Sequence, residues 1–266
     1  MSYSLTWLPA VLKAAGLKVA ECPGWQTSGI GEMGTVLGVL CHHTATTIRT
    51  GNMPSLNILI HGRTGSDALQ GPLAQLGLGR DGTYYIIAAG RCNHAGPGKW
   101  KEITSGNTHL IGIEAENMGH ESLEKWPEVQ LQAYYRGVAA ILNHIGRDED
   151  YCIGHKEYRL PKGYKDDPDL DMNNFRLQVK KIMTELKAGA TPPLIPAAES
   201  SGLKRPTLRR GATNDPALVK TIQQAIGVDP DGDFGPNTEA AVRAFQSAHH
   251  MVPDGIVGPK TWEQIG

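Results

Sequence analysis

Three short stretches of the sequence carry side chains that could perform hydrolytic chemistry. VLCHHTATT ends an apolar run in His42 and His43, LIGIEAE carries Glu114, and CIGHKEYRLPKGYKDDPDLD holds a histidine, a lysine and several aspartates. Catalytic zinc takes about three nitrogen, sulfur or oxygen ligands and keeps a position for water. Two histidines and one carboxylate or thiolate from these stretches would suffice. A proton acceptor and an oxyanion partner would still be needed, and Glu114 and Lys165 have the right chemistry for these tasks.

The spacing alone does not establish such a site. His42 and His155 are 113 residues apart, and the chain has no compact metal signature such as His-Glu-x-x-His. Neighbouring side chains on a strand point to opposite faces, so His42 and His43 should not both face one site. The residues alone therefore leave a zinc hydrolase as one hypothesis among several.

The elements that must position these side chains alternate between strands and helices. Apolar runs predict strands at 36–43, 81–90 and 109–118. Apolar residues at helical spacing, with proline or glycine near the ends, predict helices at 4–16, 127–146 and 172–186. This alternation predicts a single α/β domain.

A linker separates this domain from a small tail. Residues 188–206, rich in alanine, proline, serine and glycine, show no apolar periodicity and divide 1–187 from 207–266. The tail repeats itself, with DGDFGPNT at 231–238 and DGIVGPKT at 254–261. Gly-Pro should end one direction of the chain before each new helix, which predicts a three-helix module with two Asp-Gly loops.

Composition narrows the range of partners and surroundings. A net charge of −1 argues against a broad nucleic-acid surface and against a polybasic membrane anchor. The first twenty residues do not form a convincing signal peptide, and no apolar run is long enough to span a bilayer. We expect a monomer that is made as a soluble cytoplasmic protein, or one that leaves the cell by a route the sequence does not encode.

The four cysteines form no Cys-x-x-Cys pair, and a chain of this length does not need disulfides. We expect them to be reduced and mostly buried. Three lie within a few residues of a histidine, so a thiolate ligand to zinc stays an alternative; they are Cys41, Cys92 and Cys152.

Five segments, in order, resemble the type 2 N-acetylmuramoyl-L-alanine amidase domain: VLCHHTA, RDGTYY, RCNHAG, IGIEAEN and IGHKEY…KGYKDDP. The resemblance covers roughly residues 20–185. It implies a mixed central sheet flanked by helices, a zinc cofactor and peptidoglycan as the partner. The tail resembles the three-helix peptidoglycan-binding module of many cell-wall hydrolases. An amidase joined by a linker to that module has the layout of a modular phage endolysin.

The resemblance also implies roles for particular residues. The zinc ligands would be His42, His155 and Asp167, the last directly before a proline. Glu114 would be the catalytic acid and base, and Lys165 would assist at the oxyanion.

Two further histidines are expected beside the substrate. His94 of HAG is similar to a substrate-contacting position, and His43 would contact substrate or donate a hydrogen bond to the turn. The chain departs from some relatives at Ala74 and Gln75, where they place an aromatic residue and a histidine. Glu114 should therefore matter more here.

Several assignments stay open at this point. Asp166, Asp169 or Cys152 could replace Asp167 as the third ligand. Glu116 could take part directly or be a solvated carboxylate at the sheet edge.

The expected reaction is hydrolysis of the amide between the lactyl group of N-acetylmuramic acid and L-alanine, with lysis of the bacterial cell as its result. A phage-encoded enzyme would reach the wall from the host cytoplasm by way of a holin. Alternatives are a recognition protein that binds peptidoglycan without cutting it, a stem-peptide endopeptidase, and a recycling amidase for soluble muropeptides.

Overall fold

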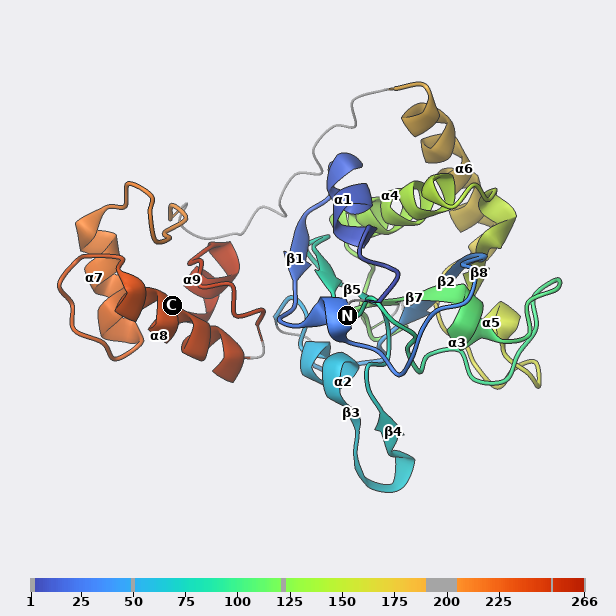
Figure 1. Cartoon of the computed structure of the whole chain (residues 1–266), viewed down its shortest axis with the longest axis horizontal. Coiled ribbons are helices and arrows are strands. Elements are labelled where there is room, and N and C mark those ends of the chain that lie inside the picture. The colour runs from blue at the N-terminus through green and yellow to red at the C-terminus, as the bar shows by residue number, and fades with distance from the viewer. Residues whose placement is uncertain (1–2, 49–50, 121–122, 190–204, 250, 266) are drawn as a thin grey trace. The chain divides into compact units, whose positions relative to one another are not determined.

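The computed structural model of the chain divides into two compact units, Met1–Ala198 and Glu199–Gly266 (Figure 1). It describes residues 3–48, 51–120, 123–189, 205–249 and 251–265. Most of the predicted linker at 188–206 lies outside these residues, so its boundaries stay a prediction.

The larger unit is built on a six-stranded sheet in the order β1-β6-β5-β7-β2-β8. Only the β5–β6 pair is antiparallel, and the other neighbouring strands run parallel. The expected mixed sheet is thus confirmed. The strands are β1 (Val19–Glu21), β2 (Gly38–His43), β5 (Leu76–Leu78), β6 (Tyr84–Ile86), β7 (Leu110–Ala115) and β8 (Cys152–Gly154). A separate two-stranded hairpin pairs β3 (Gly62–Arg63) with β4 (Leu69–Gln70).

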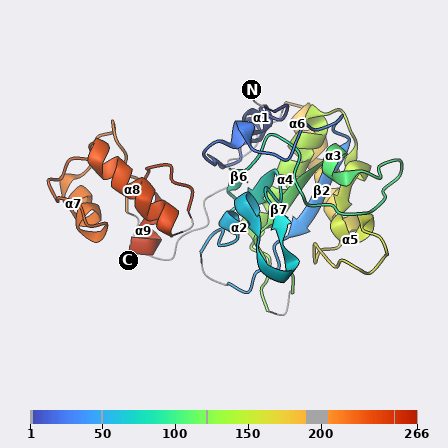
Figure 2. The same cartoon turned by 60° about the horizontal axis from the view of Figure 1, so that its bottom comes forward.

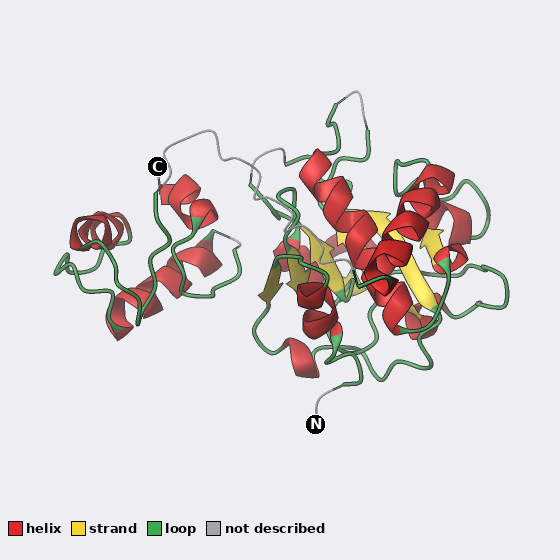
Figure 3. Cartoon of the chain, turned by 90° about the horizontal axis from the view of Figure 1, so that it is seen from above, coloured by secondary structure: helices red, strands yellow, loops and turns green. Residues whose placement is uncertain are grey.

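Three helices cover one face of the sheet: α1 (Leu8–Ala14), α4 (Glu128–His144) and α6 (Met172–Lys187) (Figures 1 and 3). Their apolar residues share the main core with those of the sheet. A smaller core lies on the opposite face, where Leu40 and Ile153 pack with Tyr158. The shorter helices α2 (Leu56–His61), α3 (Gly106–His109) and α5 (His155–Tyr158) lie apart from α1, α4 and α6 (Figure 1). No helix in the described parts of the chain is long and apolar enough to cross a membrane.

Strand alternation decides which side chains can reach a common site. Val39 and Cys41 of β2 enter the main core, and Leu40 enters the smaller one. His42 therefore continues the row of Leu40, on the face away from the long helices. Because His42 is paired in register with Glu114 of the parallel strand β7, an imidazole and a carboxyl lie side by side at the strand ends.

All four cysteines are buried and have free thiols, as expected. Cys152 lies in the main core, where its Sγ is 3.8 Å from Sγ of Cys41. Burial, followed by the contact with Cys41, raises the pKa of the Cys152 thiol well above its usual value. A protonated thiol on this face is a poor candidate for the third zinc ligand.

The smaller unit contains the three predicted helices: α7 (Pro216–Ala225), α8 (Pro236–Ala248) and α9 (Pro259–Ile265). Asp215 caps α7 by accepting the Ala217 N–H at 2.9 Å. A compact core joins the helices through Leu208, Val219, Ile222, Phe234, Val242, Val257 and Trp262.

A buried glutamine organises each repeat of this unit. The side-chain NH₂ of Gln223 and of Gln246 donates to the aspartate of its loop and to the threonine of the next helix. Each side-chain oxygen accepts the N–H of the loop glycine. Both glutamines stand 8 residues before the aspartate of their repeat. This shared spacing is the sequence feature from which their role could have been inferred.

Candidate active site

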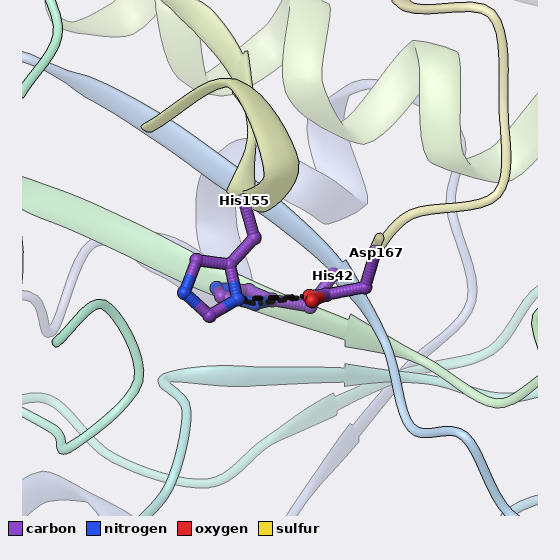
Figure 4. Close-up of side chains that lie close together, drawn as sticks. All are labelled: His42, His155 and Asp167. Atoms are coloured by element: carbon purple, nitrogen blue, oxygen red, sulfur yellow. Dashed lines mark hydrogen bonds and ion pairs between the residues drawn. The ribbon is translucent and has the colours of Figure 1, made fainter. Parts of the chain in front are cut away.

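Two histidines and an aspartate converge at the end of β2 (Figure 4). His42 Nδ1 lies 3.0 Å from both His155 Nδ1 and Asp167 Oδ2, and the last two atoms are 2.9 Å apart. All three side chains are buried, although Asp166 and Asp169 beside them are exposed. The structure thus brings together the three residues predicted as zinc ligands.

The donor set suits a metal ion. Since the carbonyl of Ala95 can only accept, His155 Nε2, 3.1 Å away, must carry the proton. In the neutral form of the ring, the Nδ1 of His155 presents a lone pair to the Asp167 carboxylate, so these two acceptors at 2.9 Å could share a metal ion. Tetrahedral zinc sites hold such atoms about 3.3 Å apart, close to the separations here.

Burial and charge keep these groups in the forms that bind metal. Burial, together with the nearby His155, lowers the pKa of His42 to about 4. Burial alone would raise the pKa of Asp167, but the two imidazoles beside its carboxyl, those of His155 and His42, bring that pKa well below its usual value. A neutral imidazole and an ionised carboxylate are the states that bind a cation at neutral pH.

A tyrosine that the sequence analysis did not single out fixes the backbone at His42. The Tyr134 hydroxyl, fully buried on α4, accepts the His42 N–H at 2.9 Å. The hydroxyl oxygen also lies 3.0 Å from the His42 carbonyl oxygen and 3.1 Å from that of Ile113, so the hydroxyl can donate to either. Tyr134, Val138 and Ile141 share one helical face, and this spacing is the sequence feature that could have revealed Tyr134.

His43 holds the loop that delivers Asp167. Its Nδ1 accepts the Asp169 N–H at 3.1 Å, so it receives a hydrogen bond from this turn and does not donate one. Gly119, with φ of +72°, lies so close that an added Cβ would meet the ring at 2.0 Å. The Lys156 N–H donates to the Asp167 carbonyl at 2.7 Å and fixes the same loop from α5. A contact between His43 and substrate stays a prediction.

Glu114 lies beside the three converging side chains. Its Oε1 is 3.9 Å from His42 Nδ1, and its side chain is 16% exposed. The other oxygen, Oε2, is buried and has no hydrogen-bond partner among the described residues. Burial and the charge of Asp167 raise the pKa of Glu114 well above its usual value. A partly exposed carboxyl with an unsatisfied oxygen is available to exchange a proton with a bound molecule.

Two cations act on this carboxyl from the rim. The charges of Lys165 and of Arg63 on β3 both lower the pKa of Glu114, and thereby oppose the effect of burial. The Lys165 side chain is exposed and belongs to the loop between His155 and Asp167. The sequence analysis did not anticipate Arg63, because nothing in the sequence placed the hairpin near the site.

His94 contacts the outer side of His42. Its Nδ1 lies 3.2 Å from His42 Nε2, and the two rings meet edge to face. Burial, followed by the charges of His42 and His155, lowers the pKa of His94 well below its usual value. A neutral ring here can orient the imidazole of His42, as outer partners of metal-bound histidines do. Whether His94 also contacts substrate stays a prediction.

Glu116 is not a solvated edge carboxylate, and that alternative was wrong. The residue is fully buried, and its carboxyl accepts hydrogen bonds from the Ser55 N–H, the Ser55 hydroxyl and the Thr44 hydroxyl, at 2.9 to 3.0 Å. The strand ends at Ala115, so the alternation that suggested an exposed edge no longer applies. Glu116 joins the segments before α2 and after β2.

Gln75 occupies an interior position next to the sheet. Its amide oxygen accepts the Gly112 N–H at 2.7 Å, and its NH₂ donates to the Gly90 carbonyl at 3.2 Å. It therefore satisfies backbone groups of β7 and of a neighbouring loop, and is not available for catalysis. This agrees with the expectation that residues 74–75 give no catalytic help.

Comparison with protein families identifies both units. Residues 32–169, just over half of the chain, match the model of the N-acetylmuramoyl-L-alanine amidase family. Residues 217–265 match a family described as a putative peptidoglycan binding domain. No curated protein matches the chain.

Several solved structures are similar to the chain. A selenomethionine derivative of AmpD is 20% identical over 62% of this chain and 94% of its own, with a TM-score of 0.46. AmiD from E. coli, in complex with anhydro-N-acetylmuramic acid-L-Ala-D-γ-Glu-L-Lys, is 17% identical over 88% of both chains, with a TM-score of 0.43. A mutant endolysin from Bacillus subtilis is 15% identical over 61% of this chain and 99% of its own, with a TM-score of 0.44.

The chain belongs to the N-acetylmuramoyl-L-alanine amidase family. It is thus a peptidoglycan hydrolase that carries a second, peptidoglycan-binding region at its carboxyl end.

Proposed function

We propose that this amidase depends on zinc held by His42, His155 and Asp167, and that it cleaves the bond between N-acetylmuramic acid and L-alanine in wall peptidoglycan. The convergence of two Nδ1 atoms and one carboxylate oxygen within 3.0 Å carries this proposal. Bound zinc would polarise the scissile carbonyl and acidify a water molecule, as in other zinc hydrolases.

Glu114 would serve as general base and then as general acid. The carboxylate accepts a proton from the attacking water and passes it to the leaving nitrogen of L-alanine. Its raised pKa brings the proton affinity of the carboxylate closer to that of the water and the amine, and its partial exposure lets a bound molecule reach the side chain. The register between β2 and β7 keeps it beside His42 throughout.

Lys165 would stabilise negative charge as it develops on the carbonyl oxygen. Its ammonium group acts on both Glu114 and His42, which indicates that it lies within electrostatic reach of the reaction. An exposed lysine can approach a bound substrate. When the substrate excludes water from the site, the ammonium group stabilises the oxyanion more strongly than it would in open solvent.

Digestion of purified peptidoglycan with zinc-loaded protein tests the proposed reaction. We expect stem peptides with a free L-alanine amine and glycan chains with intact muramic acid, identified by mass spectrometry. New ends within the peptide would point to an endopeptidase. Binding to sacculi without new ends would point to a recognition protein, and cleavage of soluble muropeptides alone would favour the recycling role.

The carboxyl-terminal unit would hold the enzyme at the insoluble wall. A weak attachment there raises the local concentration of the catalytic unit at its substrate. This pairing suits a lytic enzyme of the phage endolysin type that reaches the wall through a holin, and lysis of susceptible cells on external addition would support that role.

Truncation after Gly189 should weaken binding to sacculi by about tenfold or more, because it removes the second attachment. The measurement is co-sedimentation with purified sacculi, in parallel with cleavage of a soluble muropeptide. The muropeptide rate is the control and should stay within about twofold. Unchanged co-sedimentation would contradict a binding role for the carboxyl-terminal unit.

A further inference from the structure

The loop that joins His155 to Asp167 exposes two apolar side chains. Tyr164 is 63% exposed and Leu160 is 42% exposed. Both belong to one short segment that ends in Lys165 and Asp167. Single exposed apolar residues are common on protein surfaces and need no explanation. Two of them on the loop that carries the proposed ligand Asp167 and the proposed catalytic Lys165 suggest a function.

Arg159 fixes the position of the Tyr164 ring. Its guanidinium carbon lies 4.6 Å from the ring centroid, a cation–π contact that stabilises the ring in one place. The Arg159 Nη1 donates to the Pro97 carbonyl at 2.6 Å, and the Leu160 N–H donates to the same oxygen at 3.1 Å. The Tyr164 ring is therefore exposed to solvent, and its position is fixed by Arg159.

The anchor of Arg159 belongs to the segment that touches a proposed metal ligand. Pro97 follows Ala95, whose carbonyl accepts from His155 at 3.1 Å. Gly96 between them has φ of +59°, and an added Cβ would meet Arg159 Nη1 at 3.1 Å. The two loops project beside α5 in Figures 1 and 2. The aromatic ring is thus linked, through Arg159 and Pro97, to the segment whose Ala95 carbonyl contacts His155.

We propose that Tyr164 is a substrate-positioning residue whose ring stacks on the pyranose ring of N-acetylmuramic acid. This inference rests on the proposed function, which places a sugar on one side of the scissile amide and a peptide on the other. The peptide carries carboxylates, which suit the guanidinium of Arg63. The C–H face of a pyranose is apolar and flat, and it suits an exposed aromatic ring fixed in place before binding.

Two ligands separate a sugar contact from a peptide contact. One is the substrate N-acetylmuramoyl-L-Ala-γ-D-Glu-L-Lys. The other is its sugar-free counterpart, D-lactoyl-L-Ala-γ-D-Glu-L-Lys, tested as a competitive inhibitor of the first. With zinc-loaded full-length protein, Tyr164→Ala should raise KM for the muramoyl substrate by roughly three- to tenfold, with kcat within about twofold. The inhibition constant of the sugar-free compound should not change.

Two further variants serve as controls. Tyr164→Phe should behave as the wild type, because stacking needs the ring and not the hydroxyl. Leu177→Ala removes a side chain on α6 that is 65% exposed, and it should change neither constant.

An equal rise in both constants would overturn the proposal in favour of a peptide contact. A fall in kcat with loss of zinc would overturn it in favour of a structural role for the loop. No change in either constant would also overturn it. The wild type is tested first. If it does not release a peptide with L-alanine at its amino terminus from the muramoyl substrate, the proposed function itself is wrong.

Discussion

Glu114→Gln is expected to lower kcat by about 10²- to 10⁴-fold, the usual contribution of a positioned general acid and base. Glutamine has nearly the same shape but cannot accept a proton from water at neutral pH. Because Glu114 lies 3.9 Å from His42 Nδ1 and outside the group of three converging side chains, the variant should keep its zinc. The measurement is kcat on a soluble muropeptide, together with metal content by atomic absorption.

A matched change elsewhere separates catalysis from folding. Glu128→Gln alters an exposed glutamate at the start of α4 and should leave the rate within about twofold. If Glu114→Gln keeps more than about one tenth of the wild-type rate, another group must accept the proton, and the assigned role is wrong.

His42→Ala should abolish hydrolysis and remove most of the bound zinc, because it deletes one of three ligands from a buried site. His155 and Asp167 would then be the only protein ligands left to coordinate the ion. Treating the wild type with a chelator should give the same loss, and adding zinc back should restore the wild type but not the variant. The measurements are the rate of hydrolysis, the zinc content of the purified protein, and circular dichroism as a check of folding.

The control for this variant is His61→Ala, which removes an exposed histidine at the end of α2. Its activity and zinc content should match the wild type. A His42→Ala protein that is folded, free of zinc and fully active would disprove the metal site.

The sequence predicted three of the six strands of the sheet, β2, β6 and β7, and missed β1, β5 and β8, which are three residues long each. The apolar run before His42 predicts a buried strand, and alternation along that strand requires the two adjacent histidines to face different surroundings. The structure agrees, with His42 among the proposed ligands and His43 on the Asp169 N–H. The family resemblance supplied the rest, since spacing alone could not join His42 to residues more than a hundred positions away.

Side-chain contacts between segments far apart in the chain could not be predicted from the sequence. Tyr134 bonds the backbone of β2 from a helix 92 residues further on, and Glu116 bonds a segment 61 residues before it. Both depend on how loops and helices pack, and a single sequence carries no record of that packing. The hairpin with Arg63 is a similar case, because a two-residue strand gives almost no periodicity.

The three converging side chains have an additional consequence for stability, because they come from separate pieces of the chain. His42 is the last residue but one of β2, His155 begins α5, and Asp167 lies in an irregular loop. An ion held by all three binds only the folded chain, because unfolding separates the ligands. The bound ion would therefore act as a non-covalent cross-link between these three segments. At free zinc 100 times the dissociation constant, such binding would add about 2.7 kcal/mol to the free energy of unfolding. The supply of zinc would then govern how long the enzyme survives proteolysis, in addition to how fast it works.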